Sequence, residues 1–297
     1  MLGEKATPIY QGFTQQELDA EYNNQAKISL PEFQRFLARC EHLSADARDN
    51  YRCHLDVPYG DGAEDTVDIF IPHDIDRNAP VEVFFHGGYW RMLNKSDFSY
   101  VAAGFVPQGY VTVIVNYPLV PTVPFDTLVE KCRRATAWVY RNIQQYNGDR
   151  QRMYLSGHSA GAHLVAMMLA TQWQGYGIQE AAKVFRGAAA VSGIYDLEAI
   201  RLSYLNEILG LSHETVERNS PVALRPQVST PLLLVVGSRE GKEYLRQSTD
   251  IANRWSAHGV PTELAILGEE DHFSIRAQFG VPESALMKLI IKHRRKG

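Results

Sequence analysis

A serine between two glycines has the sequence context of a catalytic nucleophile. Residues 157–161 read GHSAG, after a short run with β character at 152–156 and before a helical run at 162–171. A serine on such a tight turn needs flanking glycines, because a Cβ there would crowd the backbone. The turn exposes the hydroxyl of Ser159, and the N–H of Ala160 at the helix start can stabilise a developing negative charge. The pattern predicts nucleophilic attack on a carbonyl carbon.

The base that activates such a serine is a histidine, and His272 has the best position for it. It follows the last expected strand, residues 262–267, and precedes a helix. In open α/β sheets the functional side chains gather at the carboxyl ends of the strands, and in α/β-hydrolases the histidine comes last in the chain. The alternatives are in an irregular segment, late in an expected helix and in the C-terminal tail: His213, His258 and His293.

The acid that orients the histidine should follow the penultimate strand, expected at residues 231–236. Glu240 lies in the loop after that strand and is the best candidate. Asp196, which follows an earlier strand, is its main rival. Glu243 lies one helical turn further on, and Asp271 adjoins the histidine itself. The residue types and their order predict a serine, acid and histidine triad that transfers an acyl group.

A second glycine pair supplies the donors that such chemistry requires. Gly87 and Gly88 follow the strand expected at residues 81–85 and lie well upstream of the serine. Without a Cβ, their backbone can approach a substrate oxygen closely. We expect the N–H groups of Gly87, Gly88 and Ala160 to form an oxyanion hole.

Tyr89 and Trp90 follow these glycines, and we expect both to bind substrate as walls of the pocket, with core packing as the alternative. The chemistry requires no cofactor and no metal. The three cysteines form no C-x-x-C pair, so the sequence suggests neither a zinc site nor a redox pair.

The elements that must position these residues alternate between strand and helix. Strands are expected at 51–57, 66–71, 81–85, 111–115, 153–156, 187–191, 231–236 and 262–267, and helices at 14–24, 31–50, 125–145, 162–171, 243–258 and 283–293. Such alternation predicts an α/β fold with a mostly parallel sheet covered by helices on both faces. We expect a single domain over residues 1–297, with a helical extension at 1–50 and a lid or insertion at 193–226.

Composition narrows the class of protein. The chain has 297 residues, is 45% hydrophobic and carries a formal net charge of −4, which gives no reason to expect a nucleic-acid partner. No apolar run approaches the roughly 18 residues of a membrane span, and the N-terminus has no signal-peptide core. We therefore expect a cytoplasmic protein that acts on small molecules and has no membrane partner.

Several segments resemble one family. The HGGYW sequence at 86–90 resembles the HGGxW signature of the kynurenine formamidase (arylformamidase) branch of the α/β-hydrolases, whereas related esterases usually carry HGGG or HGGA. Further similar segments are EYNNQA at 21–26, NYPLVP at 116–121, GHSAGAHL at 157–164, SGIYDL at 192–197 and NSP at 219–221. The resemblance covers nearly the whole chain.

This resemblance implies an α/β-hydrolase fold and a hydrolase that removes the formyl group of N-formyl-L-kynurenine in tryptophan catabolism. The family's nucleophile and base correspond to Ser159 and His272. Two departures stand out: the acid loop reads GSRE at 237–240 instead of G-x-H-D, and Ala162 replaces a glycine. The alternatives are a general carboxylesterase or amidase and a non-catalytic ligand-binding protein of the same fold. Family analogy favours a homodimer.

Overall fold

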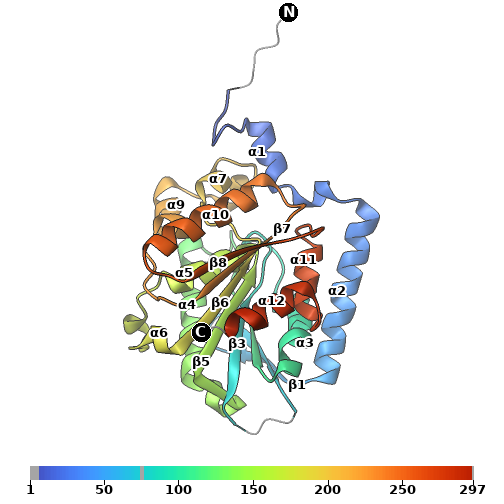
Figure 1. Ribbon diagram of the computed structural model, residues 1–297, viewed down its shortest axis with the longest axis vertical. Helices are drawn as coiled ribbons and strands as arrows, with labels where there is room; N and C mark the ends of the chain where they lie inside the picture. The colour runs from blue at the N-terminus through green and yellow to red at the C-terminus, as the bar shows by residue number, and fades with distance from the viewer. Residues whose placement is uncertain (1–6, 74–76, 296–297) are drawn as a thin grey trace, which may run out of the picture.

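The computed structural model describes residues 7–73 and 77–295 (Figure 1). The ends of the domain expected over 1–297, residues 1–6 and 296–297, lie outside the described residues. No helix in the described part is long and apolar enough to cross a membrane.

A single eight-stranded sheet forms the centre of the described chain, with the strand order β1-β2-β4-β3-β5-β6-β7-β8. Strands β1, β2 and β4 pair antiparallel, and every pair from β4 through β3 to β8 is parallel. The strands are β1 Arg52–Pro58, β2 Thr66–Ile71, β3 Ala79–Phe85, β4 Val111–Val115, β5 Gly148–His158, β6 Phe185–Val191, β7 Leu232–Gly237 and β8 Thr262–Leu267. The mostly parallel α/β fold expected from the sequence is confirmed.

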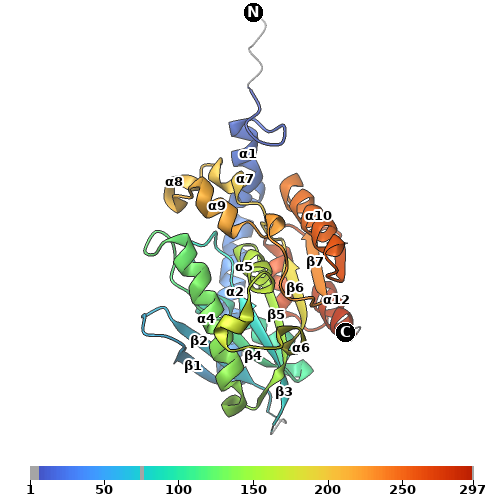
Figure 2. The ribbon, with the colours of Figure 1, turned by 90° about the vertical axis from the view of Figure 1, so that its left-hand side faces the viewer.

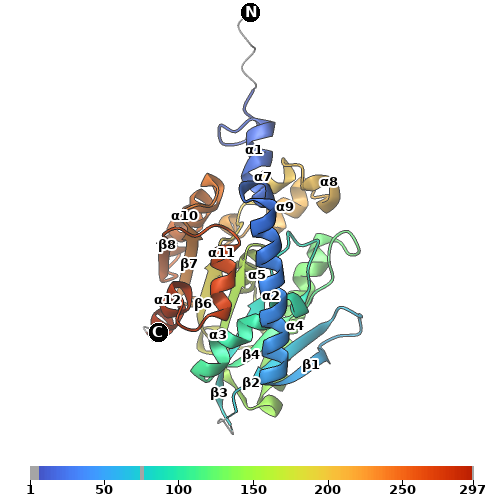
Figure 3. The ribbon, with the colours of Figure 1, turned by 90° about the vertical axis from the view of Figure 1, so that its right-hand side faces the viewer.

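Helices cover both faces of this sheet (Figures 2 and 3). They are α1 Gln15–Tyr22, α2 Leu30–Asn50, α3 Ala102–Phe105, α4 Phe125–Asn142, α5 Ala160–Leu169, α6 Ala181–Val184, α7 Glu198–Arg201, α8 Asn206–Leu209, α9 His213–Asn219, α10 Lys242–Ala257, α11 Ser274–Ala277 and α12 Ala285–Arg294. Helices α4, α5 and α10 lie on one face, whereas α2, α3, α11 and α12 lie on the other. The segment expected to be a lid, 193–226, folds into three short α-helices, α7 to α9, and a 3-10 helix, Pro221–Ala223.

The strands supply two cores because successive side chains point to opposite faces. On β3, Val81, Val83 and Phe85 pack toward α4 and α5, while Phe84 packs toward α3 and α12. All five residues of β4 are buried, as we expected from its lack of a polar face. This double covering leaves the carboxyl ends of the parallel strands as the place where loops can build a site.

One buried ion pair crosses from the sheet to the last helix. The carboxylate of Glu82, on β3, accepts from the guanidinium of Arg294 on α12, and also from the hydroxyl of Ser156 on β5. Burial raises the pKa of Glu82 to about 7, although Arg294 opposes the shift. The guanidinium lies 4.7 Å from the ring centres of both Phe105 and Tyr154. Arg294 therefore fastens the C-terminal helix to the sheet.

We predict that Arg294→Met destabilises the fold by about 3–5 kcal/mol, because it leaves a buried carboxyl group without its cation. Urea unfolding followed by circular dichroism measures the difference. The control is Lys292→Met on the exposed face of the same helix, which should change stability by about 0.5 kcal/mol or less. Equal stability of the two variants would contradict the role given to the pair.

Candidate active site

Ser159 lies at the junction of β5 and α5 with a backbone conformation that few L-residues adopt. Its φ and ψ are 58° and −121°. A Cβ on Gly161 would lie 1.9 Å from the carbonyl oxygen of Phe85, and one on Gly157 would lie 2.4 Å from the carbonyl of Gly161. Both glycines are therefore sterically required. Such backbone strain, on the order of 1–3 kcal/mol, persists only where the surrounding structure enforces it.

His272 reaches this serine from the loop that follows β8. Its Nε2 lies 3.1 Å from the Oγ of Ser159, a hydrogen-bonding distance. The side chain is buried, and its ring packs against the rings of His158 and Tyr244, whose centres lie 4.5 Å and 4.8 Å away. The other histidines considered from the sequence lie in α9, at the end of α10 and in α12: His213, His258 and His293.

Glu240 completes a continuous line of hydrogen bonds. Its Oε2 lies 2.7 Å from the Nδ1 of His272. Its Oε1 accepts from the hydroxyl of Ser192 at 2.6 Å and from the N–H of Gly237 at 2.8 Å. Both carboxylate oxygens are thus engaged, and the side chain is fully buried. Glu240 is held in one orientation by its own turn and by the end of β6.

The rival carboxylates have partners elsewhere. The phenol of Tyr10 donates to Asp196 at 2.7 Å, and the guanidinium of Arg246 pairs with Glu243. Asp271 accepts from backbone N–H groups of the turn that follows it. Among the described residues, only Glu240 is a carboxylate within hydrogen-bonding distance of the ring of His272.

Gly87 and Gly88 pass directly beside the serine. A Cβ on Gly87 would lie 2.9 Å from the carbonyl oxygen of His158 and 3.2 Å from the Cβ of Ser159. Gly88 has a φ of 118°, and a Cβ there would lie 2.1 Å from the carbonyl oxygen of Met92. The structure thus requires glycine at both positions and brings them next to the nucleophile.

The N–H groups expected to bind an oxyanion have no competing acceptor. Within the part of the chain that the structure describes, the N–H groups of Gly87, Gly88 and Ala160 donate to no protein oxygen. Ala160 is the first residue of α5, where N–H groups have no partner inside the helix. These three donors are available to a ligand.

Tyr89 and Trp90 diverge, although they are adjacent in sequence. Tyr89 lines the cavity at Ser159, and its hydroxyl donates to the carbonyl oxygen of Tyr22 at 2.6 Å. Trp90 is fully buried, and its Nε1 donates to the Nδ1 of His163 at 3.2 Å. The expectation that Trp90 lines the pocket is wrong. Left-handed backbone at both residues turns their side chains to different sides of the loop.

The cavity at Ser159 has a volume of about 180 Å³ and a roof made by the N-terminal helices. Tyr22, Asn24, Phe33 and Leu37 line it from this region, whereas only Tyr204 lines it from the segment 193–226. We did not anticipate from the sequence that residues 22–37 form the roof. The only sequence feature noted in this region was the EYNNQA segment at 21–26, which resembles the family. That 193–226 acts as a lid stays a prediction.

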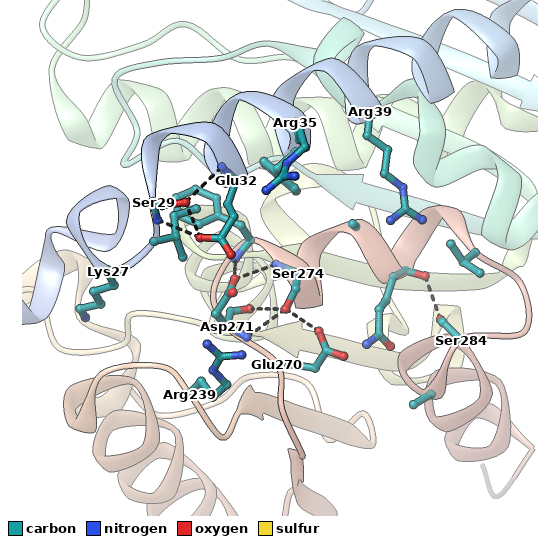
Figure 4. A pocket seen from close by; sticks show the side chains of 17 residues that line it. Lys27, Ser29, Glu32, Arg35, Arg39, Arg239, Glu270, Asp271, Ser274 and Ser284 are labelled. Carbon is teal, nitrogen blue, oxygen red and sulfur yellow. Dashed lines mark hydrogen bonds between the residues drawn. The ribbon is translucent and has the colours of Figure 1, made fainter.

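A larger cleft of about 650 Å³ lies between α2 and residues 270–285 (Figure 4). Arg35 and Arg39 extend from α2 above it, and Arg239 lies opposite. This cleft contains neither Ser159 nor His272, so its size does not make it the reaction site. Phe273 lines both spaces. The smaller cavity is the candidate active site because its lining contains the nucleophile Ser159, the hydrogen-bonded His272 and the two glycines of the donor loop.

Two further histidines near the serine, His158 and His86, are fully buried, which disfavours their charged forms. Burial lowers the pKa of His158 well below its usual value and that of His86 to about 4. Neither adds a positive charge that would compete with a reacting imidazole. Among residues 7–73 and 77–295, no three His, Cys, Asp or Glu side chains are grouped to hold a metal ion.

Comparisons with known proteins identify the family and several relatives of this chain. The BD-FAE family model matches residues 67–254. The chain is 35% identical to the kynurenine formamidase of Danio rerio, over 80% of each chain, and 35% identical to that of Salmo salar, over 80% of this chain and 81% of the other. A solved structure of a candidate thioesterase from Silicibacter superposes with a TM-score of 0.81 and 27% identity, over 93% of this chain and 99% of the other.

We predict that Gly88→Ala lowers kcat by about 10²–10³-fold, because the new Cβ would displace the loop that carries an oxyanion donor. Steady-state hydrolysis of a chromogenic ester measures the loss, and circular dichroism verifies the fold. Gly175→Ala is the matched control, since open space surrounds that glycine. Wild-type activity in Gly88→Ala would exclude a tight donor loop.

Proposed function

Since the chain belongs to the BD-FAE family and to the kynurenine formamidase branch of the α/β-hydrolases, we propose that it is a serine hydrolase that cleaves aryl formamides. The observation that carries this proposal is the unbroken line of hydrogen bonds from Ser159 through His272 to Glu240. It ends beside three unpaired N–H donors at a small cavity. This arrangement supports acyl transfer through a covalent intermediate.

In the first half-reaction, Ser159 Oγ attacks the formyl carbon while the Nε2 of His272 takes the hydroxyl proton. The carbonyl oxygen becomes an oxyanion, to which Gly87, Gly88 and Ala160 donate hydrogen bonds. Collapse of this intermediate breaks the C–N bond, and His272 returns the proton to the leaving amine. The products are a free arylamine and a formyl ester on the serine.

In the second half-reaction, water attacks the formyl ester and gives a proton to His272. The second tetrahedral intermediate expels the serine oxygen, which recovers that proton, and formate leaves. Glu240 holds the imidazole in its orientation and stabilises the imidazolium that forms. Its hydrogen bonds to Ser192 and Gly237 support that role, because they fix the carboxylate before the substrate arrives.

The small cavity supports a formamide over a bulky ester. A volume of about 180 Å³ beside Ser159 leaves little room for a long acyl chain next to an aromatic leaving group. Aromatic and apolar side chains line it, including Tyr89, Phe33 and Phe273, which suits an aryl group. The second candidate is a carboxylesterase for short acyl groups, since the same oxyanion donors serve esters.

The cellular setting is also a proposal. Cys40, Cys53 and Cys132 are free thiols, which supports a reducing compartment such as the cytoplasm. The net charge of −4 supports a small-molecule substrate rather than a nucleic acid. A homodimer rests on family analogy, and sedimentation velocity of the purified protein tests it.

We predict that Ser159→Ala lowers kcat for N-formyl-L-kynurenine by about 10⁴–10⁶-fold, because no other group can carry the formyl intermediate. Formate release measures the rate. A loss of less than tenfold would contradict the nucleophile. If the wild-type protein hydrolyses p-nitrophenyl acetate and butyrate but no formamide, the esterase is the correct function. If it hydrolyses none of them, the fold serves ligand binding instead.

We predict that Glu240→Gln lowers kcat by about 10⁴-fold, because glutamine favours the wrong histidine tautomer and cannot stabilise the imidazolium. Asp196→Asn is the matched control, since this carboxylate binds Tyr10 instead of the histidine. It should keep its activity within a fewfold of wild type. The reverse order of the two variants would transfer the role of the acid to Asp196.

A further inference from the structure

The charges around the candidate active site are unbalanced. Two arginines, Arg91 and Arg276, line the cavity that contains Ser159, and no aspartate or glutamate among the described residues lines it. The nearby histidines His158 and His86 are held neutral by burial. Glu240 lies behind His272, outside this lining. The cavity wall therefore presents two guanidinium groups to a ligand and no carboxylate.

Arg276 is the buried member of this pair. It is 6% exposed, and its guanidinium carbon lies 4.7 Å from the ring centre of Phe36 and 4.4 Å from that of Phe98. Its Nε donates to the hydroxyl of Tyr100 at 3.1 Å, and it forms no ion pair with any described carboxylate. The two rings and the phenol fix its position. It contributes a permanent positive potential that a surface charge, surrounded by water, could not supply.

Arg91 is the member that can reach a ligand. It follows the oxyanion loop directly, and its backbone N–H donates to the carbonyl oxygen of Gly88 at 3.1 Å. Its side chain is half-buried, and its Nε is shielded from solvent without a hydrogen-bond acceptor. No ion pair joins it to a described residue. An unsatisfied buried donor on a charged group is unfavourable, so a missing acceptor is expected at this point.

The exposed arginines of the neighbouring cleft are different. Arg35, Arg39 and Arg239 project into open space, where water satisfies their donors (Figure 4). Such surface cations need no ligand to explain them. Arg91 does need a ligand to explain it, because water cannot reach its Nε. Its backbone is also held in place by the hydrogen bond to Gly88.

We propose that Arg91 binds a carboxylate of the substrate, with Arg276 strengthening the local positive potential. The guanidinium fork matches a carboxylate with two parallel hydrogen bonds, which a lysine cannot reproduce. The substrates are then acylated arylamines that carry a carboxylate, and neutral amides and esters are disfavoured. This inference rests on the proposed function and specifies its substrate class. N-formyl-L-kynurenine belongs to that class.

The test compares two substrates that differ only in charge, N-formyl-L-kynurenine and its carboxamide, with formate release as the readout. In wild-type protein we expect the carboxylate to have the lower KM. Arg91→Gln should raise the KM of the carboxylate by about 10- to 100-fold and change that of the carboxamide by less than about twofold. Arg91→Lys should lie between the two. Arg39→Gln is the control for a change of net charge.

A binding measurement separates this inference from the proposed function. Calorimetry on Ser159→Ala and on Ser159→Ala with Arg91→Gln gives the affinity of both ligands without turnover. If wild-type protein does not cleave formamides but Ser159→Ala prefers the carboxylate through Arg91, the formamidase proposal fails and the carboxylate site stands. Equal affinities for the two ligands, or equal weakening of both by Arg91→Gln in a folded protein, would overturn the assignment of Arg91.

Discussion

The site depends on the close approach of two backbone segments at the nucleophile. The carbonyl of Phe85, at the end of β3, lies where a side chain of residue 161 would have to be, and the carbonyl of His158 lies against Gly87. Because Gly161 and Gly87 permit these contacts, the strained turn of Ser159 and the loop of oxyanion donors form one rigid unit. A Cβ on either glycine would force the nucleophile away from the donors it must act with.

The parallel sheet brings residues that are far apart in the sequence together beside Ser159. Strands β5, β6, β7 and β8 are adjacent in the sheet, and the loops after them supply Ser159, Ser192, Glu240 and His272 in the same order. The longer glutamate is accommodated because its turn folds back, so that the N–H of Gly237 at the end of β7 binds the carboxylate. A departure from the family's usual acid loop is thus compatible with a hydrogen-bonded line.

Local sequence signals predicted most of the strands, the helices and the serine turn. The features that they did not predict depend on contacts between residues far apart in the sequence. The apolar run 111–115 and the turn at 157–161 identify a covered strand and a strained serine from their neighbours alone. Local sequence signals did not predict that residues 22–37 cover the cavity. The apolar side chains Phe33 and Leu37 on α2 resemble any amphipathic helix until the fold brings them to the cavity. The places of Arg91 and Trp90 depend on the left-handed backbone of their loop. The residue types at these positions do not predict that backbone conformation.

The most direct measurement of the central claim is covalent labelling by a fluorophosphonate, located by peptide mass spectrometry. If the serine, histidine and glutamate act as one relay, the folded protein will carry a single adduct on Ser159, and His272→Ala will label far more slowly. Labelling at another residue, or an unchanged rate in a folded His272→Ala, would contradict the account.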